Sequence, residues 1–506
     1  MSVEKEINIT EKKNACLEKI TEVFDNNADN EFIIEKIYNH VHGLNLFIIN
    51  LKKQIEERTL RKEELTKQKE MFTKNFLINN QFFFNSSNNK YFYYDRINYS
   101  NISEDDIHFK CVTGITNHYN LNDWKQKTKI SVLKEIKSKS IFKTIPDTVT
   151  IQNVHSKLTP LFFKTKTETK YFLTIIGDNI LKKGSDLNYF INPKCKMFLN
   201  ELQDQVNISF GNYNVIDNFK TKYKDHTLLN MRLIEVNNNI ENKDLWAIFI
   251  KEYTLDFICV CIYYSNRYSC SEDFLHNEAR RSIKNNILFL KSNDQNTVVE
   301  MFIKDYLIID PTIKNEISWK NMHFLWKKFI ENLNIPNVVY TNTLKQKLLL
   351  ELETENDCFT GITSKYLPNI EEFLCFWNDN MICETKDKFI GEFEISEVLL
   401  LYNDYRISKN MGFSDIEEDF IIQVIYHFMD NIDIEKNKFL LNVYSKLWDK
   451  ENDVYISIQE YLTTTETSDV YGAYEYYIDQ SHGKKFIVSK GFFEKGFTNY
   501  FNDYLI

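Results

Sequence analysis

Glycine and proline are scarce in this chain, whose 506 residues include 12 glycines and 6 prolines. Folds built on repeated glycine loops, such as dinucleotide-binding sheets and propellers, are therefore disfavoured. The GxxxxGK[ST] loop, which cradles nucleotide phosphates with backbone N–H groups, occurs nowhere. A low content of both residues favours long helices joined by polar Asn, Asp and Ser turns.

Other catalytic and metal-binding signatures are also missing. The nine cysteines form no CxxC pair, and no Cys/His cluster has zinc spacing. A nucleophile elbow, HExxH, an EF-hand loop and a kinase signature are all absent. We therefore expect a protein that is not an enzyme, with no cofactor and no metal. Cys259, Cys261 and Cys375 lie in apolar runs, where we expect buried, reduced side chains.

No segment reads as a signal peptide or a membrane span. Residues 1–14 are charged, and the most apolar stretch, residues 248–264, is interrupted by Lys251, Glu252 and Asp256. We expect a buried helix there, no membrane contact, and a cytoplasmic location. At 506 residues, two to four domains are expected.

Charge is unevenly distributed around a net value of −10. Residues 121–170 contain 11 lysines and four acids, a local balance of +7. Residues 351–430 contain 18 acids and five basic residues, a local balance of −13. A basic block inside an acidic protein points to a polyanionic partner more strongly than a uniformly basic composition would.

The N-terminal part predicts a helical arm over residues 32–78. Leu44, Ile48, Leu51 and Ile55 repeat at 4-3-4 spacing, which suits either a short coiled coil or a helix packed on its own protein. Because barely two heptads are kept, we expect the second arrangement.

Aromatic runs at residues 82–84 and 91–94 flank a polar turn and predict a β-hairpin, with residues 97–99 as a possible third strand. Tyr91, Phe92 and Tyr94 could stack on bases, or they could fill the face of a small sheet.

Lysines dominate the helical stretch that follows, residues 104–142, and the segment after it. Their side chains suit a phosphate-contacting, salt-sensitive surface, or else a solvated helix face. The candidate nucleic-acid-binding lysines are Lys125, Lys127, Lys129, Lys134, Lys137, Lys139, Lys143, Lys164 and Lys166.

Residues 187–206 predict a strand, a basic turn and an amphipathic helix, which is the order of a phosphate-binding loop without its glycines. Lys194 and Lys196 are the only residues of the turn that could bind phosphate. Residues 231–236 predict a further strand, placed where a metal-holding strand would lie, with Glu235 as its acid.

The C-terminal half predicts mostly helices. Acids at residues 392–397 and 415–419 could form a metal or acid/base cluster, but without nearby His or Cys we expect solvated faces or a surface for protein partners. Residues 471–478 predict a helix, residues 485–488 a strand, and residues 492–505 a last helix, an order that suits a winged-helix-like tail.

The succession of the aromatic hairpin, the basic helices, the apolar residues 171–177 and the strand at 187–191 resembles the superfamily 3 primase-helicases of poxvirus-like large DNA viruses. Residues 486–490 and 492–495 are similar to the tail of that family. The resemblance implies a degenerate relative that retains the scaffold without ATP hydrolysis, and no catalytic residue is carried over. It also implies that the cytoplasmic location is the host cytoplasm or a viral factory, or else the virion.

These observations predict an α+β, predominantly helical fold. We expect a helical arm (1–78), an aromatic hairpin with a basic helical module (79–165), a central mixed α/β domain (166–315), an acidic helical domain (316–470) and a winged-helix-like tail (471–506). The predicted function is non-enzymatic nucleic-acid binding in viral replication or genome handling. The alternative is a structural scaffold that acts through the arm and the acidic half; a hydrolase with an unorthodox loop is the third hypothesis.

Overall fold

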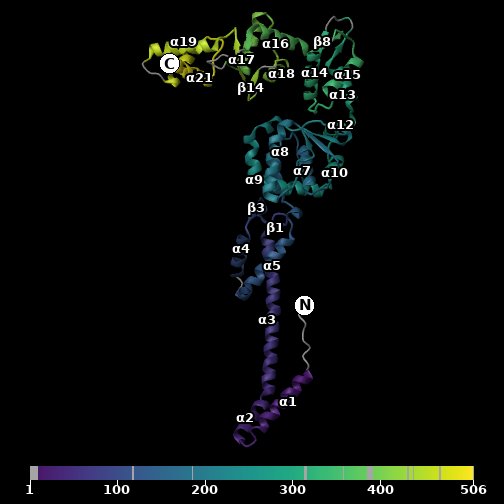
Figure 1. Cartoon of the computed structure of the whole chain (residues 1–506), viewed down its shortest axis with the longest axis vertical. Helices are drawn as coiled ribbons and strands as arrows, with labels where there is room; N and C mark the ends of the chain where they lie inside the picture. Colours follow the sequence, from purple (N-terminus) through teal and green to yellow (C-terminus); the bar gives the residue numbers. More distant parts are fainter. Residues whose placement is uncertain are drawn as a thin grey trace. The chain divides into compact units, whose positions relative to one another are not determined.

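Short strands and many helices alternate along the chain in the computed structural model (Figure 1). It describes residues 9–116, 119–184, 186–310, 312, 316–356, 358–383, 391–429, 432–436, 438–465 and 469–504. The predicted fold class is confirmed, because the fold is α+β and predominantly helical, with sheets of two or three strands in these ranges. Unit 1 draws on residues 1–185, 194–217 and 236–280, and unit 2 on residues 186–193, 218–235 and 281–506.

Three helices form the N-terminal arm in unit 1: α1 (Ile9–Asp25), α2 (Glu31–His42) and α3 (Leu44–Asn79). Asn30 caps α2 by accepting the backbone N–H of Ile33. Leu44, Ile48, Leu51 and Ile55 are 41–53% exposed. The prediction that this seam packs on its own protein is therefore wrong for the described chain.

The aromatic hairpin forms an antiparallel sheet in the order β1-β2-β3 (Gln81–Asn85, Lys90–Tyr94, Tyr99–Ile102). The third strand begins at Tyr99 rather than residue 97, because the Asp95 carboxylate accepts the backbone N–H groups of Ile97 and Asn98 and holds a turn there. The sheet shares a core with α3, α4 (Glu104–Thr116) and α5 (Lys125–Ser138).

The remaining helices of unit 1 gather around α9 (Lys243–Arg267), against which α6, α7 and α8 pack. Their bounds are α6 Thr148–Leu158, α7 Lys166–Ile180, α8 Lys196–Phe210 and α10 Ser271–Asn277. Helix α9 is the predicted buried helix, and Cys259 and Cys261 lie fully inside. Cys375 of unit 2, in contrast, is exposed, because it lies on the solvent side of its helix. No helix among the described residues is long and apolar enough to cross a membrane.

Unit 2 contains a parallel sheet in the order β5-β4-β6 (Phe219–Lys220, Asn188–Ile191, Met231–Ile234). The predicted strands at 187–191 and 231–236 are therefore both confirmed, and they are neighbours. Ile191 is in register with Ile234, so Asn192 and Glu235 each directly follow the carboxyl end of one of two adjacent strands.

The rest of unit 2 is helical, with small antiparallel sheets. Its helices are α11 Arg281–Ile287, α12 Phe289–Ser292, α13 Gln295–Tyr306, α14 Trp319–Asn332, α15 Thr341–Glu351, α16 Leu367–Asn380, α17 Ile395–Ser408, α18 Glu418–Phe428, α19 Lys450–Thr464, α20 Val470–Gln480 and α21 Lys490–Tyr504. Its short strands are β7 Ile308–Ile309, β8 Glu316–Ser318, β9 Thr354–Glu355, β10 Cys358–Thr360, β11 Ile362–Thr363, β12 Met381–Cys383, β13 Glu392–Glu394, β14 Asp433–Glu435, β15 Phe439–Leu441 and β16 Val443–Ser445.

The C-terminal tail differs from its prediction in one element. Residues 485–488 form no strand, and the described tail consists of α19, α20 and α21 around their own core. The backbone N–H of Val488 donates to the Tyr477 hydroxyl (3.1 Å) instead of to a neighbouring strand, and its side chain is buried. The strand that a winged-helix-like tail needs is thus replaced by an extended link that packs on α20.

Candidate nucleic-acid interface

Helix α5 separates its apolar residues from its lysines. Thr128, Val132 and Ile136 recur every four residues and are completely buried in the module core. Since successive residues turn by about 100°, residues 127, 134 and 137 lie on the opposite side of the helix. All three of these residues are lysines, and all three are exposed. The sequence identified the lysines, and the structure shows which of them share one face.

The three lysines of this face share α5 with one exposed acid, Glu135, and none of them is held in an ion pair in the described chain. No described carboxylate forms an ion pair with Lys127, Lys134 or Lys137, and the nearby Asp123 is bound to Arg61 at 3.1 Å. Lys127 lies over the ring of Trp124 at 4.3 Å. This half-buried tryptophan is an aromatic residue beside the lysines that sequence reasoning missed, although its position between Asp123 and Lys125 was a signal.

The other predicted lysines lie on several elements. Lys125 and Lys129 of α5 are half-buried, on the sides of the helix nearer the core. Lys139 and Lys143 are exposed in the segment after α5. Lys164 and Lys166 are exposed at the start of α7, where Thr165 and Glu168 form a capping box. Lys127, Lys134 and Lys137 will be called the α5 lysine face.

The predicted base-stacking residues are not available to a base, so that prediction is corrected. Tyr91, Phe92 and Tyr94 are 6%, 0% and 2% exposed. The Tyr91 hydroxyl donates to Glu104 (2.7 Å), and burial together with this hydrogen bond raises the pKa of Tyr91. Phe92 stacks on Phe210, with ring centroids 5.4 Å apart. Both faces of the hairpin are covered, so these rings serve the core.

The phosphate-loop-like segment keeps its order of elements but not an open anion site. Residues 193–195 form a short 3-10 helix between β4 and α8. Lys194 forms an ion pair with Glu241, while Lys196 is exposed on the first turn of α8. Since no glycine lies in the turn, the backbone lacks the freedom to form a phosphate-binding nest.

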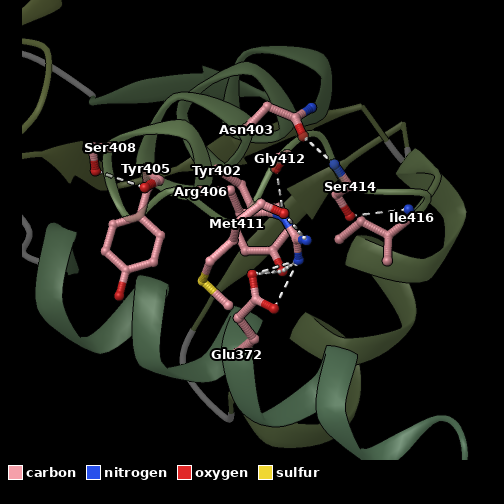
Figure 2. Close-up of polar contacts among 10 residues, drawn as sticks. All are labelled: Glu372, Tyr402, Asn403, Tyr405, Arg406, Ser408, Met411, Gly412, Ser414 and Ile416. Atoms are coloured by element: carbon pink, nitrogen blue, oxygen red, sulfur yellow. Dashed lines mark hydrogen bonds and ion pairs between the residues drawn. The ribbon is translucent and has the colours of Figure 1, made fainter.

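Carboxylates of the acidic region are used inside the fold. Both oxygens of Glu372 accept from one Arg406 nitrogen, at 2.6 and 2.7 Å, and Oε1 also accepts from the Tyr402 hydroxyl at 2.9 Å (Figure 2). The same guanidinium donates to the carbonyls of Gly412 and Met411 and so fixes the loop after α17. No group of His, Cys, Asp or Glu among the described residues could hold a metal ion. Asp415 and residues 417–419 stay exposed beside this loop.

Unit 1 also contains a buried carboxyl group, Asp256 of α9. It is 3% exposed and accepts the backbone N–H of Tyr99 at 2.6 Å. Burial raises the pKa of Asp256 to about 6, with a smaller contribution from Asp95. Because the folded pKa exceeds the unfolded one, ionisation of Asp256 destabilises the fold as pH rises from about 4 to about 6.

We expect Asp256→Asn to remove this loss of stability. The amide keeps an acceptor for Tyr99 but cannot ionise, so the variant should match the wild type near pH 4 and exceed it at pH 7 by up to about 3 kcal/mol. Urea unfolding at pH 4.5–7 measures the difference. The exposed Glu252→Gln of the same helix is the control, and equal pH profiles of all three proteins would contradict the prediction.

His155 has the opposite effect to Asp256 on the pH dependence of stability in the same pH range. Its Nε2 lies 2.8 Å from the Tyr264 hydroxyl, and burial together with Lys170 and Lys166 lowers the pKa of His155 to about 4. Because the folded pKa of this histidine lies below the unfolded one, the fold loses stability as pH falls from about 6.5 to about 4. In Asp256→Asn the opposing effect of Asp256 is absent, so the stability of the fold should rise with pH between about 4 and 6.5 because of His155.

Comparison with known proteins adds no relative. A scan against protein-family models and searches of curated proteins and of solved structures found no match to this chain.

Proposed function

We propose that the protein is a non-enzymatic nucleic-acid-binding factor and that the α5 lysine face contacts phosphates. The observation that carries this proposal is the grouping of Lys127, Lys134 and Lys137 opposite the buried stripe of α5, without acidic partners in the described chain. Unpaired ammonium groups on one rigid face can neutralise successive phosphates and release their counterions. Lys139 and Lys143 extend the exposed charge beyond the end of the helix.

In the proposed binding mode, the protein recognises the phosphates of a nucleic acid rather than the identity of its bases. Lysine contacts to phosphate position a protein on nucleic acid and carry no sequence information. Because Tyr91, Phe92 and Tyr94 are buried, Trp124 beside Lys127 is an aromatic residue nearer to these lysines that could contact a base.

The proposal includes descent from a helicase-like core of the superfamily 3 type, in viral replication or genome handling. Its support is the parallel pairing of β4 with β6, which places Asn192 and Glu235 at the carboxyl ends of adjacent strands. Ligands of open parallel sheets bind at that edge. The pairing of Lys194 with Glu241 and the lack of glycine support a core without ATP hydrolysis.

Charge reversal of the α5 lysine face tests the function. We expect Lys127→Glu/Lys134→Glu/Lys137→Glu to lower the affinity by on the order of 100-fold at 0.1 M salt, because three phosphate contacts contribute a salt slope of about 3. Fluorescence anisotropy with labelled single- and double-stranded DNA and RNA, over a salt series, measures both quantities.

The matched control is Lys291→Glu/Lys304→Glu/Lys409→Glu, which changes the net charge equally at exposed lysines of unit 2. It should bind with nearly the wild-type salt slope. Equal losses in the two triple variants would assign binding to net charge alone. A wild type that binds none of the four nucleic acids at low salt would refute the function.

A further inference from the structure

The α5 lysine face contains a large apolar side chain, that of Ile130. At about 100° per residue, Ile130 lies between Lys134 and Lys137 around the helix, roughly 160° from the middle of the buried stripe of α5. Its side chain is 66% exposed, and the core of the module does not include it. The packing of the module therefore does not account for an isoleucine at this position.

Ile130 also lies on the path from one lysine to the next. Lys127 and Lys134 are separated by about 10 Å along the helix axis. Ile130 lies between them, three residues after Lys127 and four before Lys134, and residues at these spacings are neighbours on a helix surface. A chain of phosphates that contacts both lysines must therefore pass over the Ile130 side chain.

An aromatic ring lies at the start of the same path. Trp124 directly precedes α5 and is half-buried, and the Lys127 ammonium lies 4.3 Å from the centre of its ring. An ammonium that rests on a ring, rather than beside a carboxylate, keeps its net charge for a phosphate. Glu135 of α5 lies about 140° from Ile130 around the helix, so it is not part of this surface.

The mixture of lysines and apolar side chains selects one form of nucleic acid. The backbone of a duplex presents phosphates and sugars, so Ile130 would lose water there without gaining an apolar contact. The bases of a single strand can turn toward the protein and cover apolar or aromatic side chains while the backbone follows the lysines. A membrane-surface helix, in contrast, inserts a whole apolar face, and that face of α5 is buried in the module.

We propose, on the basis of the proposed function, that the α5 lysine face binds single-stranded nucleic acid. In this arrangement, the phosphates contact Lys127, Lys134 and Lys137, one base covers Ile130, and another base of the strand lies against Trp124. The apolar contacts contribute to affinity without adding charge. They are therefore separable from the phosphate contacts by salt dependence.

Ile130→Gln tests this inference in the full chain, because it removes the apolar contact and leaves the charge unchanged. We expect the affinity for labelled single-stranded DNA or RNA to fall about fivefold at every salt concentration, with the salt slope of the wild type. Trp124→Leu should lower it by about 10-fold, also with an unchanged slope. Affinity for the corresponding duplexes should not change, and the wild type should bind the single strands more tightly than the duplexes. Fluorescence anisotropy measures all of these quantities.

Ile248→Gln is the matched control, because Ile248 is 63% exposed on α9 of the same unit. It should bind like the wild type. Equal wild-type affinity for single strands and duplexes, with no effect of Ile130→Gln on either, would overturn the inference and leave the proposed function standing. A larger loss for the duplex would place Ile130 in a duplex groove and would also overturn the inference. Binding of neither form at low salt would refute the proposed function itself.

Discussion

Replacement of Gly177 by alanine should destabilise unit 1 by about 2 kcal/mol or more, because α7 and α9 approach too closely for a side chain. A Cβ atom at this position would overlap the Cys261 carbonyl oxygen and lie 2.7 Å from the Ser265 Cβ. Both obstacles belong to α9, and its backbone cannot move aside as a flexible side chain could. The better helix propensity of alanine, about 1 kcal/mol, offsets only part of this cost.

Gly114→Ala in α4 is the matched control, because it is also a glycine within a helix of unit 1. There, the nearest obstacle to a Cβ atom is the Phe72 ring at 3.3 Å, which can shift slightly. We expect Gly114→Ala to lie within about 1 kcal/mol of the wild type. The midpoint of urea unfolding, followed by tryptophan fluorescence, compares the two variants. Equal midpoints would show that α7 and α9 can separate at little cost.

This glycine illustrates what the sequence could and could not predict. The apolar stretch at residues 248–264 predicted a buried helix, and α9 is present there. Nothing local indicates that Gly177 contacts residue 261, since that contact depends on how two helices pack. In the same way, the run of aromatics at residues 91–94 beside a polar turn predicted a strand. They did not predict that Phe210, far along the chain, would cover Phe92.

The candidate interface was also predictable only in part, because composition indicates which residues are exposed but not which of them share a face. Lysines are rarely buried without a partner, so composition alone placed most of the basic block at the surface. Which lysines share a face depended on the buried stripe of α5, which is only weakly patterned because Thr128 is one of its members. Lys194 was predicted as a possible phosphate ligand, and its ion pair with Glu241 depends on chain segments that are 47 residues apart.

Replacement of Lys450 by methionine should destabilise unit 2 by about 3–5 kcal/mol, because it leaves the buried Glu397 carboxylate without its counter-charge. Lys450 is 4% exposed and donates to Glu397 (2.7 Å) and to the Glu392 carbonyl (2.9 Å). Its ammonium also lies 3.9 Å from the centre of the Phe492 ring, on α21. The pair therefore joins the acidic region to the tail.

The pH dependence of this variant identifies the mechanism. Burial raises the pKa of Glu397, and Lys450 is the main influence that lowers it. Without the lysine, that pKa should rise further, so protonation of Glu397 would restore stability as the pH falls. Lys450→Met should thus be less destabilised at pH 5 than at pH 8, and Glu397→Gln/Lys450→Met should recover much of the loss at both values.

Lys490→Met is the control, because Lys490 pairs with Glu494 across 3.9 Å at the surface, with both side chains about half exposed. Such a pair contributes between about 0 and 1 kcal/mol. If Lys450→Met lowered the free energy of urea unfolding no more than Lys490→Met does, the buried Glu397 carboxylate would be stabilised by a group other than Lys450. Glu372 and Glu397 are both neutralised inside the fold, so a basic protein partner would instead meet exposed acids of the region, such as Glu353, Glu371 and Asp415.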